Sequence, residues 1–269
     1  MTMTTKIIWI TGASTGIGRA LALAFAHGGA QVIASARSAL ALEDLVDSQH
    51  AHPIHTEACD VTDTDSLQKA ADNIQQRFGK VDTLIVNAGT CEYFDVAQPD
   101  WQMMARVMKV NYFGAINTVA AALPLLRQST NAHIAGIASM ASDVAFPKAQ
   151  AYGSSKAAVR YFFESLSVDL AKENIAVTVV RPGFVKTPLT DKNDFPMPFM
   201  VTADDFAQTL VKRLPKQPLY IRYPRRLGWI LSLMSCLPRL WHGFAVSKLV
   251  DSQNASTSSD KKITEPLRD

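Results

Sequence analysis

Hydrophobic residues gather in short runs along this chain, and longer stretches with a helical period of apolar and polar residues separate them. The runs lie at about residues 7–11, 31–36, 54–59, 83–87, 133–138, 175–181 and 218–221. Buried parallel strands give continuous apolar runs of this length, and helical stretches between them are typical of βαβ units. The pattern therefore predicts an α/β protein built on a Rossmann-type, doubly wound parallel sheet.

The first apolar run leads into a glycine-rich sequence, Thr11-Gly12-Ala13-Ser14-Thr15-Gly16-Ile17-Gly18. A helix-compatible stretch follows at once, so we expect a strand-to-helix turn here. Glycine adopts backbone angles that other residues resist and lets main-chain amides approach a phosphate. The turn and the dipole of the following helix are predicted to hold a pyrophosphate. The spacing, Gly-x-x-x-Gly-x-Gly, departs from the general dinucleotide pattern Gly-x-Gly-x-x-Gly.

Tyr152 and Lys156 lie four positions apart in the sequence, which places them on one face of a helix. With the two polar groups about 5 Å apart at an effective dielectric of about 20, the ammonium would stabilise the phenolate by roughly 3 kcal/mol. That attraction corresponds to a decrease of about 2 units in the tyrosine pKa. The pair is thus predicted to exchange a proton near neutral pH. An isolated pair of this kind can also be an ordinary surface pair on an amphipathic helix.

Further motifs occur in a fixed order along the chain. They are the turn with Gly12, Gly16 and Gly18, then Asn87-Ala88-Gly89 after an apolar run, Ser139, and Tyr152-x-x-x-Lys156. Together they resemble the short-chain dehydrogenase/reductase family. Asn111 and the segment Arg181-Pro182-Gly183-Phe184-Val185-Lys186-Thr187 extend the resemblance, which covers roughly residues 5–222. The resemblance implies hydride transfer between a nicotinamide cofactor and a carbonyl or alcohol.

The resemblance implies a role for each matching residue. Tyr152 would exchange the proton, Ser139 would hydrogen-bond the reacting oxygen, Lys156 would lower the Tyr152 pKa and bind the nicotinamide ribose, and Asn111 would hold a water that relays the proton. Ser139 has an alternative as a strand-end hydroxyl, and Asn111 as a buried amide that braces a helix kink. The implied cofactor contacts are Gly12, Ser14, Gly16, Ile17, Gly18, Arg37, Asp60, Val61, Asn87, Ala88, Gly89, Tyr152, Lys156, Pro182, Gly183, Val185 and Thr187.

The end of the second apolar run indicates which cofactor is preferred. NAD-selective folds carry an acidic residue there, whereas this chain has Ala36 followed by Arg37. A guanidinium can bind the 2′-phosphate of NADP(H), and Ser14 can add a hydroxyl contact. NADP(H) is therefore the predicted cofactor. The alternatives are a solvated Arg37 and, for Asp60, a helix cap in place of a contact with the adenine.

Composition is compatible with a single large core. The chain has 269 residues, of which 48% are hydrophobic. Its cysteines, Cys59, Cys91 and Cys236, give neither a disulfide framework nor metal-ligand spacing, so no metal is expected. The first residues lack the features of a secretory signal. We expect a cytoplasmic protein, with peripheral membrane association as a further hypothesis.

An apolar segment lies after Thr187, where the resemblance implies a loop that covers the substrate. Phe195, Met197, Phe199 and Met200 would suit a hydrophobic carbonyl or alcohol, such as a lipid-like compound. The alternative is that these side chains pack the loop onto the core.

The C-terminal region departs from the common part of the family. Residues 206–250 contain eight basic residues and no acidic one. We predict a catalytic domain at 1–222, an apolar, basic segment at 223–250 and a disordered tail at 251–269. The uncharged stretch from Leu227 to Pro238 is too short to span a bilayer, which needs about 20 residues. It can lie on an anionic membrane surface, cover the active site or contact a partner subunit.

Partners and competing functions also follow from the motifs. The resemblance implies a homodimer or homotetramer formed by the helix after Asn111 and the helix from Tyr152 to Leu170. Apolar residues for that contact are Ala157, Ala158, Tyr161, Phe162, Phe163 and Leu166. The alternative is that they all face the protein's own sheet.

No nucleic-acid partner is expected. The competing function is a catalytically weak, nucleotide-sensing regulator or scaffold of the same fold. Extended epimerase relatives have a different glycine spacing.

Overall fold

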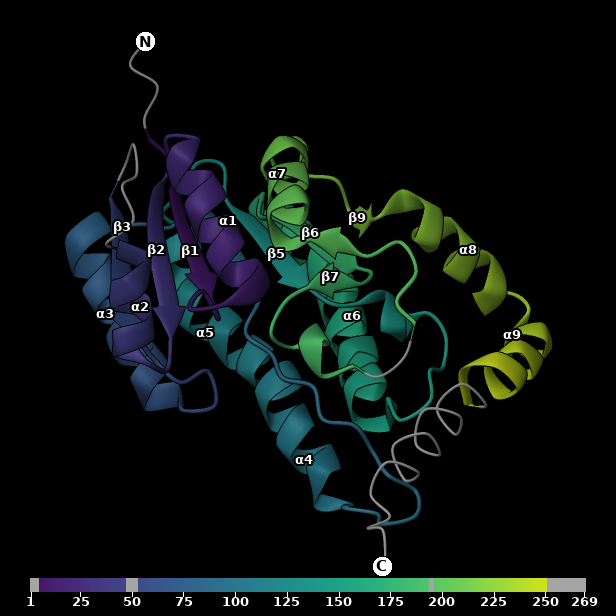
Figure 1. The fold of residues 1–269 in the computed structure, drawn as a ribbon. Helices are drawn as coiled ribbons and strands as arrows, with labels where there is room; N and C mark the ends of the chain where they lie inside the picture. Colours follow the sequence, from purple (N-terminus) through teal and green to yellow (C-terminus); the bar gives the residue numbers. More distant parts are fainter. Residues whose placement is uncertain (1–4, 47–52, 194–195, 251–269) are drawn as a thin grey trace, which may run out of the picture.

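A parallel sheet of seven strands forms the centre of the molecule (Figure 1). The computed structural model describes residues 5–46, 53–193 and 196–250. Its strand order is β3-β2-β1-β4-β5-β6-β9, so the order reverses between β1 and β4. The strands are β1 Ile7–Thr11, β2 Gln31–Ala36, β3 Ile54–Ala58, β4 Thr83–Val86, β5 His133–Ile137, β6 Ala176–Pro182 and β9 Tyr220–Tyr223. Each predicted apolar run is thus confirmed as a strand.

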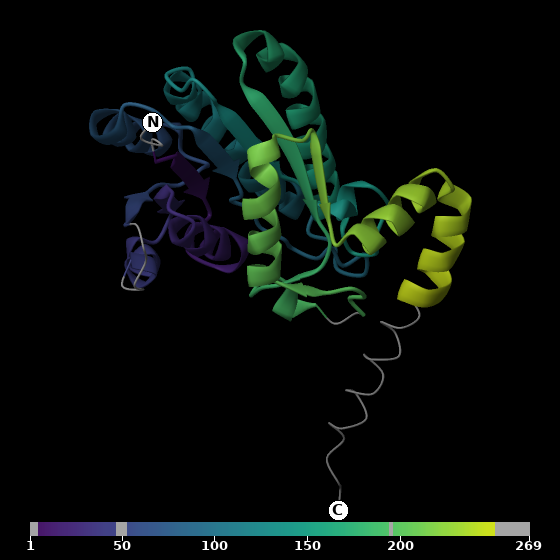
Figure 2. The same cartoon turned by 90° about the horizontal axis from the view of Figure 1, so that it is seen from above.

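Helices cover both faces of this sheet (Figures 1 and 2). One layer contains α1 Gly16–His27, α2 Ala39–Val46 and α7 Ala203–Arg213. The other contains α3 Thr64–Phe78, α5 Gly114–Leu126 and α6 Gln150–Leu170. The two apolar clusters between sheet and helices form the core, with Trp9 and Phe163 on one face and Phe206 on the other fully buried. The predicted doubly wound, single-domain α/β fold is confirmed.

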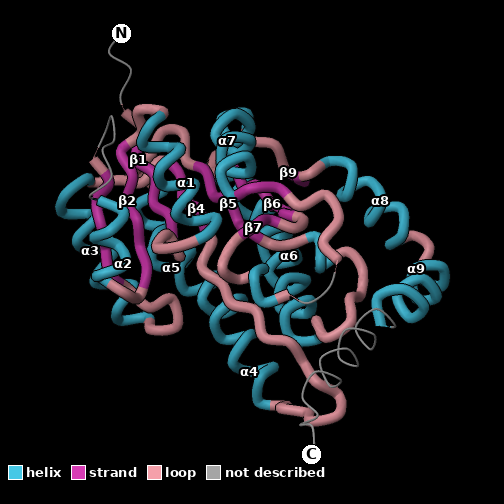
Figure 3. The backbone as a smooth tube through the Cα atoms, viewed as in Figure 1, coloured by secondary structure: helices cyan, strands magenta, loops and turns pink. Residues whose placement is uncertain are grey.

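The connections add elements that periodicity did not predict (Figure 3). Helix α4, Gln102–Met108, continues through the π-helical turn η1, Lys109–Phe113, into α5. Two short strands, β7 Val185–Lys186 and β8 Val201–Thr202, pair with each other outside the main sheet. Short turns complete the chain, namely η2 Met140–Ser142, η3 Ala171–Glu173, η4 Thr190–Lys192 and η5 Leu214–Lys216. Two-residue strands are too short for a hydrophobic pattern to reveal.

The C-terminal segment forms two further helices beyond the edge strand β9. They are α8 Arg225–Ser235 and α9 Pro238–Phe244, followed by the π-helical turn η6 Ala245–Val250. Pro238 ends the expected apolar helix, as its missing amide predicts, and it begins α9. No helix in the described ranges is long and apolar enough to cross a membrane. The predicted tail at 251–269 lies outside the described residues, and the boundary at residue 222 stays a prediction.

Candidate active site

The glycine-rich sequence forms the turn between β1 and α1. Gly12 and Gly16 have φ angles of +66° and +54°, which side chains other than glycine rarely adopt. A Cβ atom at Gly18 would lie 2.1 Å from the Gly12 carbonyl oxygen. The side chain of Thr15, at the helix N-cap, makes no hydrogen bond to the first amides of α1. The turn therefore brings main-chain amides and the positive end of the helix dipole to one edge of the sheet.

The end of β2 lies next to this turn, because the Ala13 amide donates a 3.0 Å hydrogen bond to the Ser35 carbonyl. Arg37 follows β2 and is exposed, and Ser14 is half-buried. Asp60 accepts hydrogen bonds from the Thr62 amide and hydroxyl at 2.8 and 2.9 Å. The alternative reading of Asp60 as the cap of the next helix is wrong. Asp63 caps α3 by accepting from the Asp65 and Ser66 amides.

Several other residues that were predicted to contact the cofactor pack near the glycine turn. Asn87 donates from Nδ2 to the Thr11 and Gly12 carbonyls at 3.0 and 3.1 Å. Val61 is buried against Gly114, and Ile17 packs on the core beneath α1. Ala88 approaches Gly12 so closely that a Cβ atom there would lie 2.7 Å from its Cα. The side chain of Asn87 is thus used to hold two carbonyls of the turn.

Asn111 lies in the π-helical turn η1 and is almost fully buried. Its Oδ1 accepts from the Thr90 amide at 2.7 Å, and its Nδ2 donates to the Thr90 carbonyl and to Ser155 Oγ, both at 2.9 Å. Both amide hydrogens are therefore used by the protein. The structure agrees with the alternative reading, a buried amide that braces an irregular helix. A π-helical turn is a frequent feature of functional sites.

Ser139, Tyr152 and Lys156 come together where β5 ends and α6 begins. Ser139 Oγ accepts a 3.0 Å hydrogen bond from the Ala141 amide, and its side chain also hydrogen-bonds Tyr152. Tyr152 and Lys156 lie one turn apart on α6, as their spacing predicts. Lys156 Nζ lies 5.9 Å from the centroid of the Tyr152 ring and donates to the Ile137 carbonyl at 2.9 Å.

The predicted lowering of the Tyr152 pKa is wrong for this geometry. Burial raises the pKa of Tyr152 to about 12, and the hydrogen bond from Ser139 only partly opposes that effect. Burial likewise lowers the pKa of Lys156 to about 8. Desolvation of the two side chains outweighs the attraction between their charges here, and the spacing of the residues in the sequence does not reveal desolvation.

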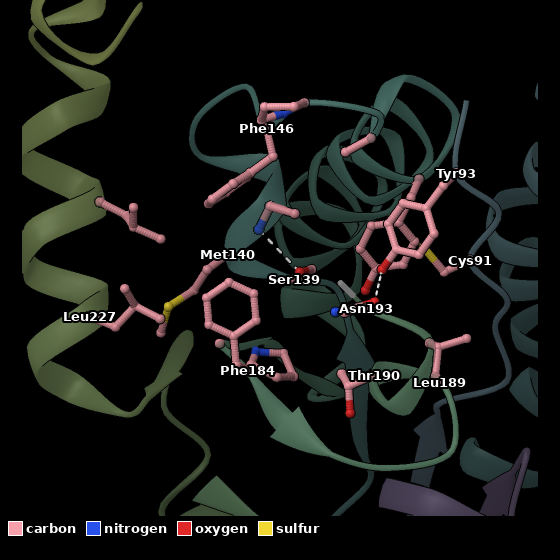
Figure 4. A pocket seen from close by; sticks show the side chains of 17 residues that line it. Cys91, Tyr93, Ser139, Met140, Phe146, Phe184, Leu189, Thr190, Asn193 and Leu227 are labelled. Carbon is pink, nitrogen blue, oxygen red and sulfur yellow. Dashed lines mark hydrogen bonds between the residues drawn. The ribbon is translucent and has the colours of Figure 1, made fainter. Parts of the chain in front are cut away.

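Ser139 and Tyr152 both line an apolar pocket. Figure 4 shows this pocket with Ser139 labelled. Cys91, Tyr93 and Asn193 also line it, and Tyr93 donates a hydrogen bond to Asn193. Its apolar walls are formed by Met140, Phe146, Phe184, Leu189, Leu227 and Leu231. Leu227 and Leu231 belong to α8, so the C-terminal segment completes the pocket. Their four-residue spacing was visible in the sequence, but nothing local indicated which surface they would meet.

Three of the four apolar residues expected to form this pocket do not line it. Phe199 and Met200 are exposed, and they do not line the pocket, nor does Met197. Phe195 lies outside the described residues. The alternative, that the loop packs on the core, also fails for Phe199 and Met200, since 46% and 40% of their surfaces are exposed.

The segment after β6 connects the pocket to the glycine turn. Pro182 and Gly183 line the pocket. Val185 instead is buried in the core on the α1 side of the sheet. A Cβ atom at Gly16 would lie 3.2 Å from Thr187 Cγ2, so Thr187 closes over the start of α1. The candidate residues thus extend from the dinucleotide turn to the pocket along the carboxyl ends of the strands, at the point where the strand order reverses.

This arrangement fits a nicotinamide dinucleotide. The glycines let the turn pack against its own backbone and against Ala88, where a Cβ atom would clash. Lys156 points its ammonium toward Gly89, and no acidic residue directly follows β2. A metal site is not seen among the described residues, where no group of three or more His, Cys, Asp or Glu side chains comes together.

Comparison with known proteins supports the same reading of the chain. A family model described as short chain dehydrogenase matches residues 6–196. An uncharacterized oxidoreductase of Myxococcus xanthus is 32% identical over 238 residues, which cover 88% of this chain and 94% of that protein. Dehydrogenase/reductase SDR family member 7B of Bos taurus is 34% identical over 192 residues. That match covers 68% of this chain and only 59% of the bovine protein.

Solved structures of similar fold include complexes with either nicotinamide cofactor. A short-chain dehydrogenase/reductase from Burkholderia phymatum in complex with NAD is 26% identical with a TM-score of 0.77, covering 86% of this chain and 93% of that one. The NADP complex of RhlG from Pseudomonas aeruginosa is 28% identical with a TM-score of 0.66, covering 70% and 76%. Similarity to these structures therefore does not distinguish NAD from NADP for this chain.

Proposed function

Because the chain belongs to the short-chain dehydrogenase/reductase family, we propose that it is an NADPH-dependent oxidoreductase that interconverts a carbonyl and an alcohol on a hydrophobic substrate. Family membership supports an oxidoreductase with a nicotinamide cofactor. One observation supports the finer proposal: Ser139 and Tyr152 both line an apolar pocket, and Lys156 lies one helical turn after Tyr152. The preference for NADPH is inferred from Arg37, and the hydrophobic substrate class is inferred from the side chains that form the pocket walls.

In the proposed reaction, Ser139 and Tyr152 act on the substrate oxygen. The glycine turn would hold NADPH, which would supply a hydride to the carbonyl carbon. Ser139 donates a hydrogen bond to the carbonyl oxygen, and Tyr152 donates its proton as negative charge develops there. A Tyr152 pKa of about 12 keeps the phenol protonated at neutral pH, which suits an acid in the reductive direction. Lys156 stabilises the phenolate that remains.

Asn111 has a positioning role in this proposal. Its amide hydrogens are committed to Thr90 and Ser155, so it holds η1 against α6. Ser155 in turn donates a hydrogen bond to the Tyr152 carbonyl. A relay water would have to bind the second lone pair of Oδ1 or a main-chain carbonyl of η1, since the side-chain donors are used.

Replacing Tyr152 tests the reaction most directly. Tyr152→Phe removes the oxygen that donates the proton and little packing volume, so we expect turnover to fall by about 10²–10⁴-fold or more. The affinity for NADPH, measured by fluorescence titration, should change little. Tyr161→Phe, at an exposed position of the same helix, is the matched control. A Tyr152→Phe enzyme that keeps most of its activity would overturn the mechanism.

The preference for NADPH is proposed from Ala36 and Arg37. An arginine at this place attracts the 2′-phosphate, and Ala36 leaves the ribose of NADH without an acidic partner. The double variant Ala36→Asp, Arg37→Leu should reverse the ratio of the Kd values for NADH and NADPH. Lys69→Leu, an exposed cation on α3, is the control and should leave that ratio unchanged. Tighter binding of NADH than of NADPH by the unmodified protein would contradict the proposal.

The hydrophobic substrate is proposed from the pocket walls. Most of the side chains that line the pocket with Ser139 and Tyr152 are apolar, so desolvation favours a carbonyl or alcohol with a large apolar body over a sugar. A panel of aliphatic, aromatic and sugar carbonyls assayed with NADPH tests this preference. A higher kcat/KM for the sugars would contradict it.

Self-association is the remaining part of the proposal. Phe163 faces the protein's own sheet, where a Cβ atom at Gly136 would lie 2.1 Å from its ring. Tyr161 and Val168 instead are 73% and 72% exposed and lie on one face of α6. An exposed apolar face on a long helix supports contact with a second copy.

A further inference from the structure

Helix α8 has two apolar faces, and only one of them is buried. Leu227 and Leu231 lie one turn apart, are almost fully buried and wall the active-site pocket. On the opposite face, Trp229 and Leu233 are 71% and 59% exposed, and Ile230 beside them is also exposed. The helix therefore needs its inner face for the pocket, whereas its outer face has no partner among the described residues.

Contacts with the body of the protein fix which face of this segment points outward. On α9, Trp241 Nε1 donates a 2.6 Å hydrogen bond to the Ala145 carbonyl, and its ring packs on Phe146 at 5.3 Å. Arg222 Nη1 donates to Ser232 Oγ on α8 at 2.5 Å. Six apolar side chains of the two helices and their connection are exposed, and we term this set the outer apolar face: Trp229, Ile230, Leu233, Leu237, Leu240 and Phe244.

Positive charge borders this face. Arg225, Arg226 and Arg239 are exposed, and the stretch 206–250 contains no acidic residue. Arg226 shares its side of α8 with Trp229, Ile230 and Leu233, because these positions follow at intervals of three, four and seven residues. Apolar side chains, a tryptophan and arginines on one helix face are the composition of a helix that lies in an anionic membrane interface.

The charge distribution favours a membrane over a second copy of the chain. A two-fold interface brings the same patch of both copies together, so the arginines would border like charges with no acid in the segment to pair them. A negatively charged lipid surface instead attracts each basic side chain. We propose that the outer apolar face of α8 and α9 docks the protein on an anionic lipid surface.

Such docking would place the pocket near the lipid. Leu227 and Leu231 wall the pocket from one side of α8, and the outer apolar face lies on the other side. One helix diameter, about 10 Å, therefore separates the pocket from the proposed contact. A lipid-like substrate would reach the pocket from the bilayer over a short path, a consequence that rests on the proposed function, whereas docking itself does not.

Vesicle flotation of the full-length protein tests the docking without requiring turnover. Vesicles of phosphatidylcholine with phosphatidylglycerol are compared with vesicles of phosphatidylcholine alone, at low and high salt. We expect the protein to float with the anionic vesicles and to do so less at high salt. Trp229→Ser with Leu233→Ser should abolish flotation, and Arg225→Gln with Arg226→Gln should lower the partition coefficient roughly 30-fold.

Matched controls separate the surface from general effects of substitution. Leu40→Ser with Val96→Ser removes exposed apolar residues far along the chain, and Lys212→Gln with Lys216→Gln removes two exposed cations of the same basic stretch. The apolar control should float like the unmodified protein, and the charge control should lose less than the arginine variant. Circular dichroism and NADPH binding confirm that each variant folds.

Two outcomes would overturn the proposal. One is that the unmodified protein stays in solution with every vesicle composition. The other is that Trp229→Ser with Leu233→Ser floats unchanged. Sedimentation velocity then shows whether this pair of substitutions dissociates an oligomer, which would assign the face to a second copy of the chain.

Discussion

At the scale of single residues, burial decides the chemistry of the site more than spacing does. Tyr152 and Lys156 lie one helical turn apart, yet burial raises the pKa of the phenol to about 12 and lowers that of the ammonium to about 8. Both shifts favour the neutral forms, as desolvation requires. The protein therefore holds the protonated phenol of Tyr152 beside the buried side chain of Lys156. Burial of the charged form of Lys156 lowers the stability of the fold.

That cost gives a pH-dependent prediction for Lys156. The pKa falls from 10.5 in the unfolded chain to about 8 in the fold, so between these values the unfolded state binds the extra proton and stability rises with pH. Tyr152 acts oppositely above pH 10, because its folded pKa of about 12 exceeds the unfolded value and stability falls as pH increases. Burial of the Lys156 ammonium therefore lowers the stability by its full amount below pH 8, and this cost decreases as the pH rises from 8 to 10.5.

Lys156→Met should therefore raise the free energy of unfolding at pH 7 while it weakens NADPH binding. Relief of burial is worth about 1.4 kcal/mol per pKa unit, and the Ile137 carbonyl left without its donor costs about 1–3 kcal/mol, so we expect a net gain of roughly 1 kcal/mol. Urea unfolding at pH 7 and pH 9.5 measures it, with the exposed Lys69→Met as control. The unmodified protein should gain more stability from pH 7 to pH 9.5 than Lys156→Met does. If both proteins gained the same amount, this account would be contradicted.

At the scale of elements, a buried ion cluster connects the Ser139 turn to its neighbours. Asp143, directly after η2, accepts from Arg181 on β6 at 2.7 Å and from Arg160 on α6 at 3.1 Å. The side chains of Asp143 and Arg181 are 3% and 5% exposed. Arg222 on β9 lies near the cluster, and burial and the charge of Arg181 lower its pKa. The negative charge of Asp143 thus stabilises the positive charges of Arg160 and Arg181.

Asp143→Asn should destabilise the protein strongly. The substitution leaves buried Arg181 without its charged partner, which typically costs about 3–5 kcal/mol. Asp100→Asn is the control, since its bridge to Arg106 is exposed and worth about 0–1 kcal/mol. Chemical denaturation measures both. We also expect a lower kcat, because Asp143 fixes the turn that carries Ser139. Equal, small effects of the two substitutions would show that the cluster contributes little.

At the scale of the whole molecule, exposed apolar faces lie on two separate parts of the surface. One is the outer apolar face of α8 and α9, and the other is the face of α6 with Tyr161 and Val168. Their separation allows the protein to contact a second copy through α6 while the C-terminal helices face a membrane.

Tyr161→Lys with Val168→Lys should weaken self-association. Introducing two charges into an apolar contact costs desolvation, so we expect a dimer or tetramer to dissociate at micromolar concentration. Multi-angle light scattering measures the mass, and Leu40→Lys, at another exposed apolar position, is the control. A monomer in the unmodified protein would contradict the proposed assembly.

The sequence by itself determined the features that depend on local pattern. Apolar runs gave the seven strands of the main sheet, because a buried parallel strand needs a continuous apolar segment. The positions of Gly12 and Gly16 indicated a turn with positive φ, and the four-residue spacing of Tyr152 and Lys156 fixed their shared helix face. These properties involve only neighbouring residues, so the chain order suffices to predict them.

Only the tertiary structure decided what each side chain meets. The walls of the pocket come from Met140, Phe146, Phe184 and α8, whereas the apolar residues at 199–200 stay exposed. The pKa of Tyr152 depends on the segments that desolvate it, and Asp63 rather than Asp60 caps α3 because of how the chain turns after β3. Burial and long-range contact arise from segments distant in the sequence, and no local pattern specifies which of them come together.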